Sequence, residues 1–357
     1  MTSEGVHVGG VDEFAGLWDP EPGWLNTASY GLPPRPAWEA LQAALSDWRV
    51  GATSWEPWDA STTRSRESFA RLVSADPRDV FVGSTVSAAL VPIAAALPDG
   101  AKVLTDDVEF TSNVFPWKVH EDRGVEVVGV PGDQLVDAIR PGVDVVAVSA
   151  VQSSTGVVLD LAAVVAASKE IGALVVIDAS QALGWLPLTV DGIDALVAHT
   201  YKWLMSPRGA TLGYLSSRLQ ELCRPTAAGW YAARDVRGSY YGTRMELADD
   251  ARRFDQSPAW FCFVGAAPAL ELVEQIGVET INRHNLELTN EFRAGLGLPP
   301  SNSAIVSTNL PGAQEAFEAA GIRAAVRDGK LRASFHIYST QADVQQALTA
   351  LKPLISG

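Results

Sequence analysis

The sequence predicts an α/β fold, with a three-layer α/β/α large domain built on a mostly parallel sheet and a smaller α+β C-terminal domain. Between about residues 80 and 215, short runs rich in Val and Ile alternate with helical patterns. Such alternation is typical of βαβ units around a parallel sheet. The chain has 357 residues, of which 47% are apolar and 19% charged. This length and composition suffice for a substantial core and two packed domains.

Each element of the alternation can be assigned from its own pattern. The first strand is expected in VFVG, directly before the helical pattern TVSAALVPIAAAL. The strands AKVLTDD and VEVVGVP follow, separated by a mixed polar and apolar segment. VDVVAVSAV and ALVVIDAS enclose the helical pattern LAAVVAASKEIG, and IDALVAHT closes the alternation.

Three parts of the chain are expected from these patterns. Residues 1–25 form an N-terminal segment, residues 26–260 the large domain and residues 261–357 the small domain. The stretch 218–260 is rich in Gly, Arg and Tyr and is expected to be a long connection. Behind it, the helical pattern FVGAAPALELVEQIGVETINRHNLELTNEF precedes shorter strands and helices.

Charge and cysteine usage exclude several classes of protein. The formal net charge of −15 argues against a nucleic acid or an anionic membrane as partner, because both attract basic surfaces. With Cys223 and Cys262 as the only cysteines, neither a disulfide framework nor a CxxC metal site is expected. A reducing cytoplasm fits this usage. No GxGxxG follows any expected strand, which argues against a Rossmann dehydrogenase.

Targeting and membrane signals are not found either. The N-terminal stretch MTSEGVHVGGVDEF has neither the basic nor the apolar region of a signal peptide. No run of 18 apolar residues is present, so no transmembrane helix is expected.

Polar residues follow several of the expected strands, where ligands of parallel sheets gather. They are Ser84, Thr85, Asp106, Asp107 and the stretches 152–155 and 178–181. Ser84 and Thr85 begin a helix, and free backbone N–H groups at a helix start bind anions. Asp178 ends the apolar run LVVID, and Lys202 lies between two aromatic residues in HTYKW. Pyridoxal phosphate needs such a set, namely an anion site, a carboxylate for its pyridine nitrogen and a lysine for its aldehyde.

The motifs resemble those of fold-type I pyridoxal-phosphate enzymes of the class V aminotransferase superfamily. This group includes cysteine desulfurases, selenocysteine lyases, kynureninases and C–S lyases. The resemblance covers roughly residues 20 to 350. It rests on GSTVSAA, DVEFTSNVFPW, VVIDASQALG, HTYKW and LRASFHIYST, in this order along the chain.

The resemblance implies a role for residues around the cofactor ring. Lys202 would form the Schiff base with the cofactor, and Asp178 would hold the pyridinium nitrogen. Gln181 would lie near the phenolic oxygen, and Phe110 would stack on the ring. Ser153 stands where many relatives have Asn beside the phenolic oxygen.

The resemblance also implies how the phosphate and the substrate are held. The implied phosphate-binding residues are Ser84, Thr85, Val86, His199 and Tyr201. Ser257, in RRFDQSPAW, would reach the phosphate of a neighbouring subunit, so a homodimer with shared sites is expected. Arg332 would bind the α-carboxylate of an amino-acid substrate, as its planar fork suits that task. Ala28 and Tyr30, in WLNTASYG, would line the mouth of the site.

One departure from the desulfurase pattern directs the functional hypothesis. The region AAGIRAAVRDGKLRAS, where desulfurases carry a catalytic cysteine, has none. We therefore expect a lyase that eliminates a leaving group from the β-carbon of a cysteine-type amino acid. An aminotransferase is the alternative, and epimerisation or kynureninase-like cleavage are further variants. A non-catalytic sensor is disfavoured, because no basic DNA-binding module precedes residue 20.

The N-terminal part of the chain is rich in tryptophan. The residues are Trp24, Trp38, Trp48, Trp55 and Trp58. We expect them to pack in the core or at a dimer interface, since their large surfaces favour burial.

Overall fold

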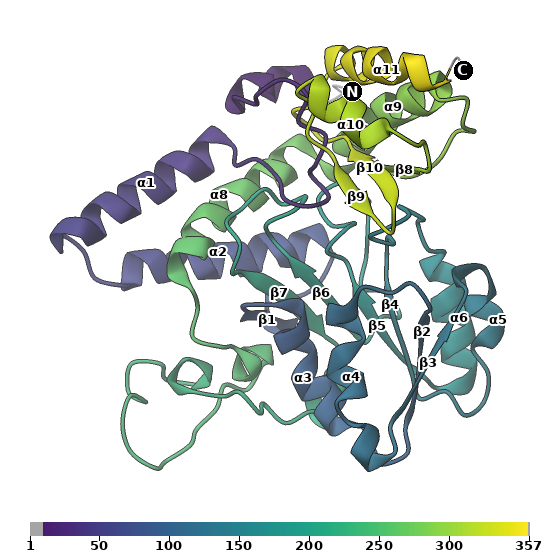
Figure 1. Cartoon of the computed structure of the whole chain (residues 1–357). Helices are drawn as coiled ribbons and strands as arrows, with labels where there is room; N and C mark the ends of the chain where they lie inside the picture. The colour runs from purple at the N-terminus through teal and green to yellow at the C-terminus, as the bar shows by residue number, and fades with distance from the viewer. Residues whose placement is uncertain (1–9, 356–357) are drawn as a thin grey trace, which may run out of the picture.

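The computed structural model describes residues 10–355. The first nine residues of the stretch that lacks signal-peptide features lie outside this range. Figure 1 shows a central sheet covered by helices, with the C-terminal elements gathered beside one edge of the sheet. The predicted α/β fold is confirmed.

The central sheet has seven strands in the order β1-β7-β6-β5-β4-β2-β3. Only β7 runs against its neighbours, so the other six strands point the same way. Their carboxyl ends therefore share one edge of the sheet. The strands are β1 (Val80–Gly83), β2 (Lys102–Asp106), β3 (Glu126–Val130), β4 (Val145–Ser149), β5 (Leu174–Asp178), β6 (Ala195–His199) and β7 (Thr211–Leu215).

Helices cover both faces of this sheet. Alternate residues of a strand point to opposite faces, so the apolar strands present side chains to be buried on each face. Val145 and Val176 pack in a cluster with residues of α3, whereas Val146 and Ile177 pack with residues of α2 and α8. The helices that accompany this sheet are α1 (Arg35–Val50), α2 (Glu56–Leu72), α3 (Val86–Ala96), α4 (Phe115–Lys118), α5 (Leu135–Ala138), α6 (Leu161–Ile171), α7 (Ser217–Leu222) and α8 (Trp260–Ile276).

The C-terminal elements have a core of their own. Antiparallel strands β8 (Ile305–Thr308), β10 (Lys330–Ser334) and β9 (Ala325–Arg327) pack with α9 (Val278–Gly295), α10 (Ala313–Ala319) and α11 (Gln341–Ile355). Leu25 from the N-terminal segment lies in the same cluster. That segment forms parallel bridges to both Arg323 and Ser334. The division of the chain at residues 25 and 260 stays a prediction.

The long helical pattern after Trp260 is interrupted in the structure. α8 and α9 meet at Gly277, where the chain bends by 81°. Gly277 has a φ of +86°, a conformation that side chains with a Cβ rarely adopt. Among the described residues, no single helix is long and apolar enough to span a membrane, and only this bent pair passes by length and composition together.

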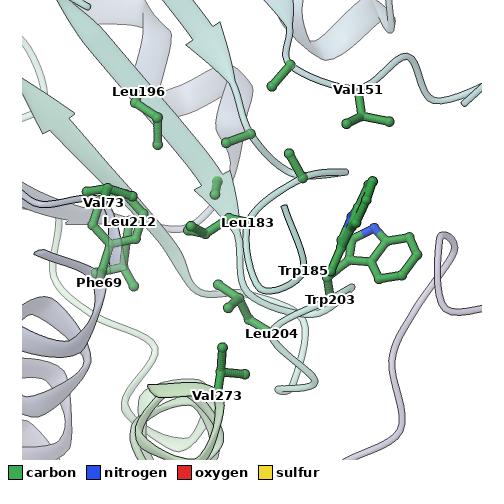
Figure 2. Packing of buried hydrophobic residues seen from close by; sticks show 14 of the residues in the cluster. Phe69, Val73, Val151, Leu183, Trp185, Leu196, Trp203, Leu204, Leu212 and Val273 are labelled. Atoms are coloured by element: carbon green, nitrogen blue, oxygen red, sulfur yellow. The ribbon is translucent and has the colours of Figure 1, made fainter. Parts of the chain in front are cut away.

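The main core extends up to the carboxyl-end edge of the sheet. Figure 2 shows the indoles of Trp185 and Trp203 side by side, with ring centroids 5.5 Å apart. Both side chains are fully buried. Because Trp203 directly follows Lys202, the lysine loop, residues 200–206, rests on well-packed apolar surface.

Candidate functional site

The carboxyl ends of the strands bring the predicted polar residues together. Asp178 is the last residue of β5, and His199 is the last residue of β6, with Lys202 three residues further on. Ser149 ends β4 and pairs in register with Asp178. Phe110 follows β2 on the far side of β4.

Lys202 is buried and surrounded by rings and cations. Its side chain is 7% exposed, and Nζ lies 5.5 Å from the Phe110 ring centroid and 5.9 Å from that of Tyr201. Burial is the main cause that lowers the pKa of Lys202 to about 8, a value that includes the opposing effect of Asp178 and the lowering effect of nearby arginines. Removing an ammonium from water favours its neutral form, which is the nucleophile that reacts with an aldehyde.

His199 lies between the start of α3 and Thr211 of β7. The Val86 N–H donates to His199 Nε2 at 3.4 Å, and Nδ1 lies 3.0 Å from Thr211 Oγ1. Because Nε2 accepts, we assign the ring proton to Nδ1. Burial lowers the pKa of His199 to about 4, so the imidazole is neutral at physiological pH. The structure thus brings His199 to Val86, and its ring lies 4.9 Å from the Tyr201 ring.

The turn between β1 and α3, residues 83–86, is more open than the lysine loop. Ser84 is exposed, and Thr85 caps α3 by accepting a hydrogen bond from the Ala88 N–H at 3.1 Å. Gln256 lies against this turn, because its Oε1 accepts from Ser84 Oγ at 3.3 Å. Ser257 directly follows Gln256, so it lies close to this turn of its own chain, and it is exposed.

Gln181 is held by the protein on three sides. Its Oε1 accepts from Trp203 Nε1 at 2.9 Å, and its Nε2 donates to Ala28 O at 2.9 Å and to Ser153 Oγ at 3.1 Å. Ser153 continues this network, because both its carbonyl and its hydroxyl accept from Arg332. A continuous chain of hydrogen bonds thus runs from the lysine loop to Arg332.

Arg332 is a buried cation without an acidic partner among residues 10–355. It is 1% exposed, and its Nη2 donates to Ser29 Oγ at 2.9 Å while Nε has no hydrogen-bond partner. Burial lowers its pKa to about 10, and the nearby Arg327 adds to the effect. Burying an unpaired charge is costly, so the site favours an anion beside Arg332.

Residues 28–31 lie against the same region. The Ala28 N–H donates to Ser334 Oγ at 2.9 Å, whereas Tyr30 is 51% exposed and packs its ring 4.7 Å from that of Trp24. The Gly31 N–H donates to Tyr201 O at 2.9 Å. A Cβ on Gly31 would overlap Lys202 O, so only glycine allows this close approach.

Sequence reasoning missed several residues of the site. Glu109 is 9% exposed, and its carboxylate accepts from Ser149 Oγ at 2.5 Å and from the Phe110 N–H at 2.7 Å. Burial raises its pKa to about 7. The rule that selected Asp178, a carboxylate at a strand end, selects Asp106 at the end of β2, whereas Glu109 lies three residues further on. The other missed residues are Ser29 and His336, which lie inside the quoted motifs WLNTASYG and LRASFHIYST, and Arg208 and Arg327, for which no motif gave a signal.

His336 supports the lysine loop from the C-terminal unit. It is fully buried, and its Nε2 lies 2.9 Å from Trp203 O while its Nδ1 lies 3.2 Å from Asn285 Nδ2. Since Trp203 O only accepts and the amide Nδ2 only donates, we assign the ring proton to Nε2. Burial lowers the pKa of His336 to about 3, which keeps this pairing intact across the physiological range.

These residues fit pyridoxal phosphate. A buried lysine with a lowered pKa lies beside the Phe110 ring, which is 47% exposed although it is apolar. A buried carboxylate, Asp178, lies nearby, and an open helix N-terminus starts at Thr85. The fold and this set of groups define an enzyme that uses pyridoxal phosphate. Within the described part of the chain, no group of three or more His, Cys, Asp or Glu side chains could hold a metal ion.

The sequence comparisons agree with this class. The family model described as aminotransferase class-V matches residues 53–315, so the chain belongs to the class-V aminotransferase family. An uncharacterized aminotransferase of Bacillus subtilis is 29% identical over 91% of this chain and 92% of its own length. An isopenicillin N epimerase of Streptomyces clavuligerus is 28% identical over 95% of this chain and 96% of its own.

Solved structures agree with the fold. The cystine C–S lyase C-DES superposes with a TM-score of 0.84 at 20% identity, covering 96% of this chain and 99% of that one. A cysteine desulfurase of Thermococcus onnurineus superposes with a TM-score of 0.82 at 21% identity, covering 94% and 95%. At this identity the similarity establishes the fold and leaves the reaction to be argued from the site.

Proposed function

We propose that the protein is a pyridoxal-phosphate-dependent C–S lyase that acts on cysteine conjugates. In this reaction a cysteine conjugate and water give a thiol, pyruvate and ammonium. The C–S bond breaks, the sulfur leaves with the bonding electrons, and the α-proton is removed. No external oxidant or reductant is needed.

The position of the thiols is the observation that carries this proposal over a persulfide-forming desulfurase. A persulfide forms when a thiolate attacks sulfur. Neither Cys223 nor Cys262 lies in residues 319–334, where desulfurases carry their catalytic cysteine. Burial also raises the pKa of both thiols, which disfavours their thiolates. Elimination needs no thiol, and the similarity to a protein described as a cystine C–S lyase supports it.

Lys202 and Asp178 would carry the chemistry. When bound, the cofactor supplies an aldehyde that forms a Schiff base with Lys202 and a ring that accepts electrons from the substrate α-carbon. Lys202 Nζ would remove the substrate α-proton, for which its lowered pKa is suited. The Asp178 carboxylate holds a proton on the pyridine nitrogen.

The other site residues would position the reactants. Arg332 binds the substrate α-carboxylate, which supplies the anion that the buried guanidinium lacks. The Phe110 ring would stack on the cofactor, and Gln181 and Ser153 would lie near its phenolic oxygen. The start of α3 would hold the phosphate. Its proposed ligands are Ser84, Thr85, Val86, His199, Tyr201 and, from a neighbouring subunit, Ser257.

A cytoplasmic homodimer is part of the proposal. Trp48 on α1 is 61% exposed, although large apolar rings favour burial. A second copy packed against Trp48 would cover it and bring its Ser257 toward the shared site. Cys223 and Cys262 are both free, which suits a reducing compartment. The boundaries at residues 25 and 260 are proposed as the limits of the large domain.

An absorbance scan during turnover tests the proposal. The purified protein is expected to absorb visible light as a Schiff base and to release pyruvate and thiol in equal amounts from a cysteine conjugate. A keto acid formed with the sulfur substituent still attached would instead establish an aminotransferase. Absence of a visible chromophore after incubation with pyridoxal phosphate would refute both.

A further inference from the structure

An apolar pocket of about 390 Å³ lies beside the site, between α1 and the lysine loop. Such a volume is in the range of about 300 to 1,000 Å³ typical of small-molecule sites. One face of α1 forms one wall, because residues three or four positions apart in a helix share a face. The residues that matter for the argument are Ala37, Trp38 and Leu41 from α1, Tyr30, and Tyr201 and Pro207 from the other wall.

Two of its wall residues also belong to the catalytic site. Ser29 lines the pocket and accepts a hydrogen bond from Arg332 at 2.9 Å. Tyr201 lines it as well, and its ring centroid lies 5.9 Å from Lys202 Nζ. An amino acid held by Arg332 and Lys202 is therefore flanked by two walls of the pocket. The side chain of that amino acid, including a substituent on its β-carbon, is therefore within reach of the pocket.

The chemistry of the walls indicates what fits there. Rings and aliphatic side chains form most of the lining, and none of the lining residues is acidic. The one charged residue, Arg208, places its guanidinium 4.9 Å from the Tyr201 ring centroid, where a cation–π contact engages it. Such walls reward the burial of apolar surface and of flat rings.

We propose that this pocket binds the leaving group, and that the natural substrate carries a bulky, apolar or aromatic group on sulfur. The inference rests on the proposed lyase function. It defines the substrate class as cysteine conjugates whose sulfur bears a ring or a branched alkyl group, rather than cysteine itself.

Three amino acids and three variants test it with the holoenzyme. β-Chloroalanine reports elimination without using the pocket, and S-benzylcysteine is compared with S-methylcysteine. Wild type is expected to prefer the benzyl compound in kcat/KM by about tenfold or more, since each buried methylene contributes about tenfold discrimination or more. Trp38→Ala and Leu41→Glu should reduce this preference by about tenfold while leaving β-chloroalanine turnover unchanged. Tyr241→Ala removes an exposed ring that lies outside both the pocket and α1 and should keep the preference.

Other outcomes would overturn the inference. Equal kcat/KM for the benzyl and methyl compounds in wild type would do so. An equal loss for all three compounds in Trp38→Ala, with a lower mass in solution, would show that the pocket serves subunit packing. If wild type does not turn over even β-chloroalanine, the lyase proposal fails by itself. In that case, dissociation constants are measured from the absorbance change on binding. If wild type binds S-benzylcysteine more tightly than S-methylcysteine and Trp38→Ala abolishes this difference, the pocket inference still stands.

Discussion

The two ends of the cofactor site differ in how completely the protein builds them. At the lysine loop, residues 200–206, the polar groups of Gln181, Trp203 and His336 bind one another or their neighbours. At the turn, residues 83–86, Ser84 is exposed and only weakly held by Gln256. The end proposed to perform proton transfer is held by these hydrogen bonds, and electrostatic catalysis requires such preorganisation. The end proposed to hold the phosphate would rely on the bound anion to complete it.

Replacing Lys202 should have the largest effect and tests the lysine-loop end. Lys202→Ala is expected to abolish the visible chromophore and all turnover, because both the Schiff base and the general base are lost. The absorbance spectrum and pyruvate release measure this, with Lys169→Ala on the exposed end of α6 as control. Residual turnover in Lys202→Ala would show that another group removes the proton.

Replacing Arg332 tests whether this buried cation binds the substrate. Arg332→Ala is expected to weaken amino-acid binding by about 2 to 5 kcal/mol, the usual cost of losing a buried charged hydrogen-bond partner. KM should rise, and the chromophore of the resting enzyme should remain. Arg332→Lys keeps the charge without the planar fork and should recover only part of the loss. An unchanged KM in Arg332→Ala would assign the carboxylate to another group.

Glu109, between the two ends, should make stability depend on pH. Its pKa rises from 4.5 to about 7 on folding, so the folded state favours the protonated acid. This contribution to stability is full below pH 4.5 and is lost as the pH rises to 7. It amounts to about 3 kcal/mol, since one pKa unit corresponds to about 1.4 kcal/mol. Urea unfolding of wild type and Glu109→Gln between pH 4.5 and 8 measures it. If the free energy of unfolding changes with pH by the same amount in wild type and in Glu109→Gln, Glu109 does not titrate in this window.

Thr85 should show the smallest effect and tests the open end. Thr85→Ala removes the N-cap of α3, which costs about 1 kcal/mol of stability, and should also weaken cofactor binding. Asp160→Ala removes the cap of α6, a helix of the same length, and should cost stability without changing cofactor affinity. Cofactor dissociation constants of the two variants give the comparison. If both variants bind the cofactor with the same dissociation constant, Thr85 is not a phosphate ligand.

The strands were predictable because each buried run carries its own signal. VFVG and LVVID became β1 and β5, since their β-branched residues pack on both faces of the sheet. The 81° bend at Gly277 was not predicted, because the helical pattern continues across a single glycine. His336 could not be foreseen either, because its partner Trp203 is 133 residues away in the chain. Local patterns report periodicity, whereas such pairings depend on how distant elements pack.

The bridges between the N-terminal segment and the C-terminal sheet have a consequence for synthesis. Trp24 and Asn26 leave the ribosome long before their partners Arg323 and Ser334 are made. The seven strands can form while the chain is still growing, since domains fold as units during translation. Arg332 and His336 reach the lysine loop only after β10 has been made. A nascent chain therefore holds Lys202 on a folded sheet before the proposed carboxylate-binding residue, Arg332, is in place.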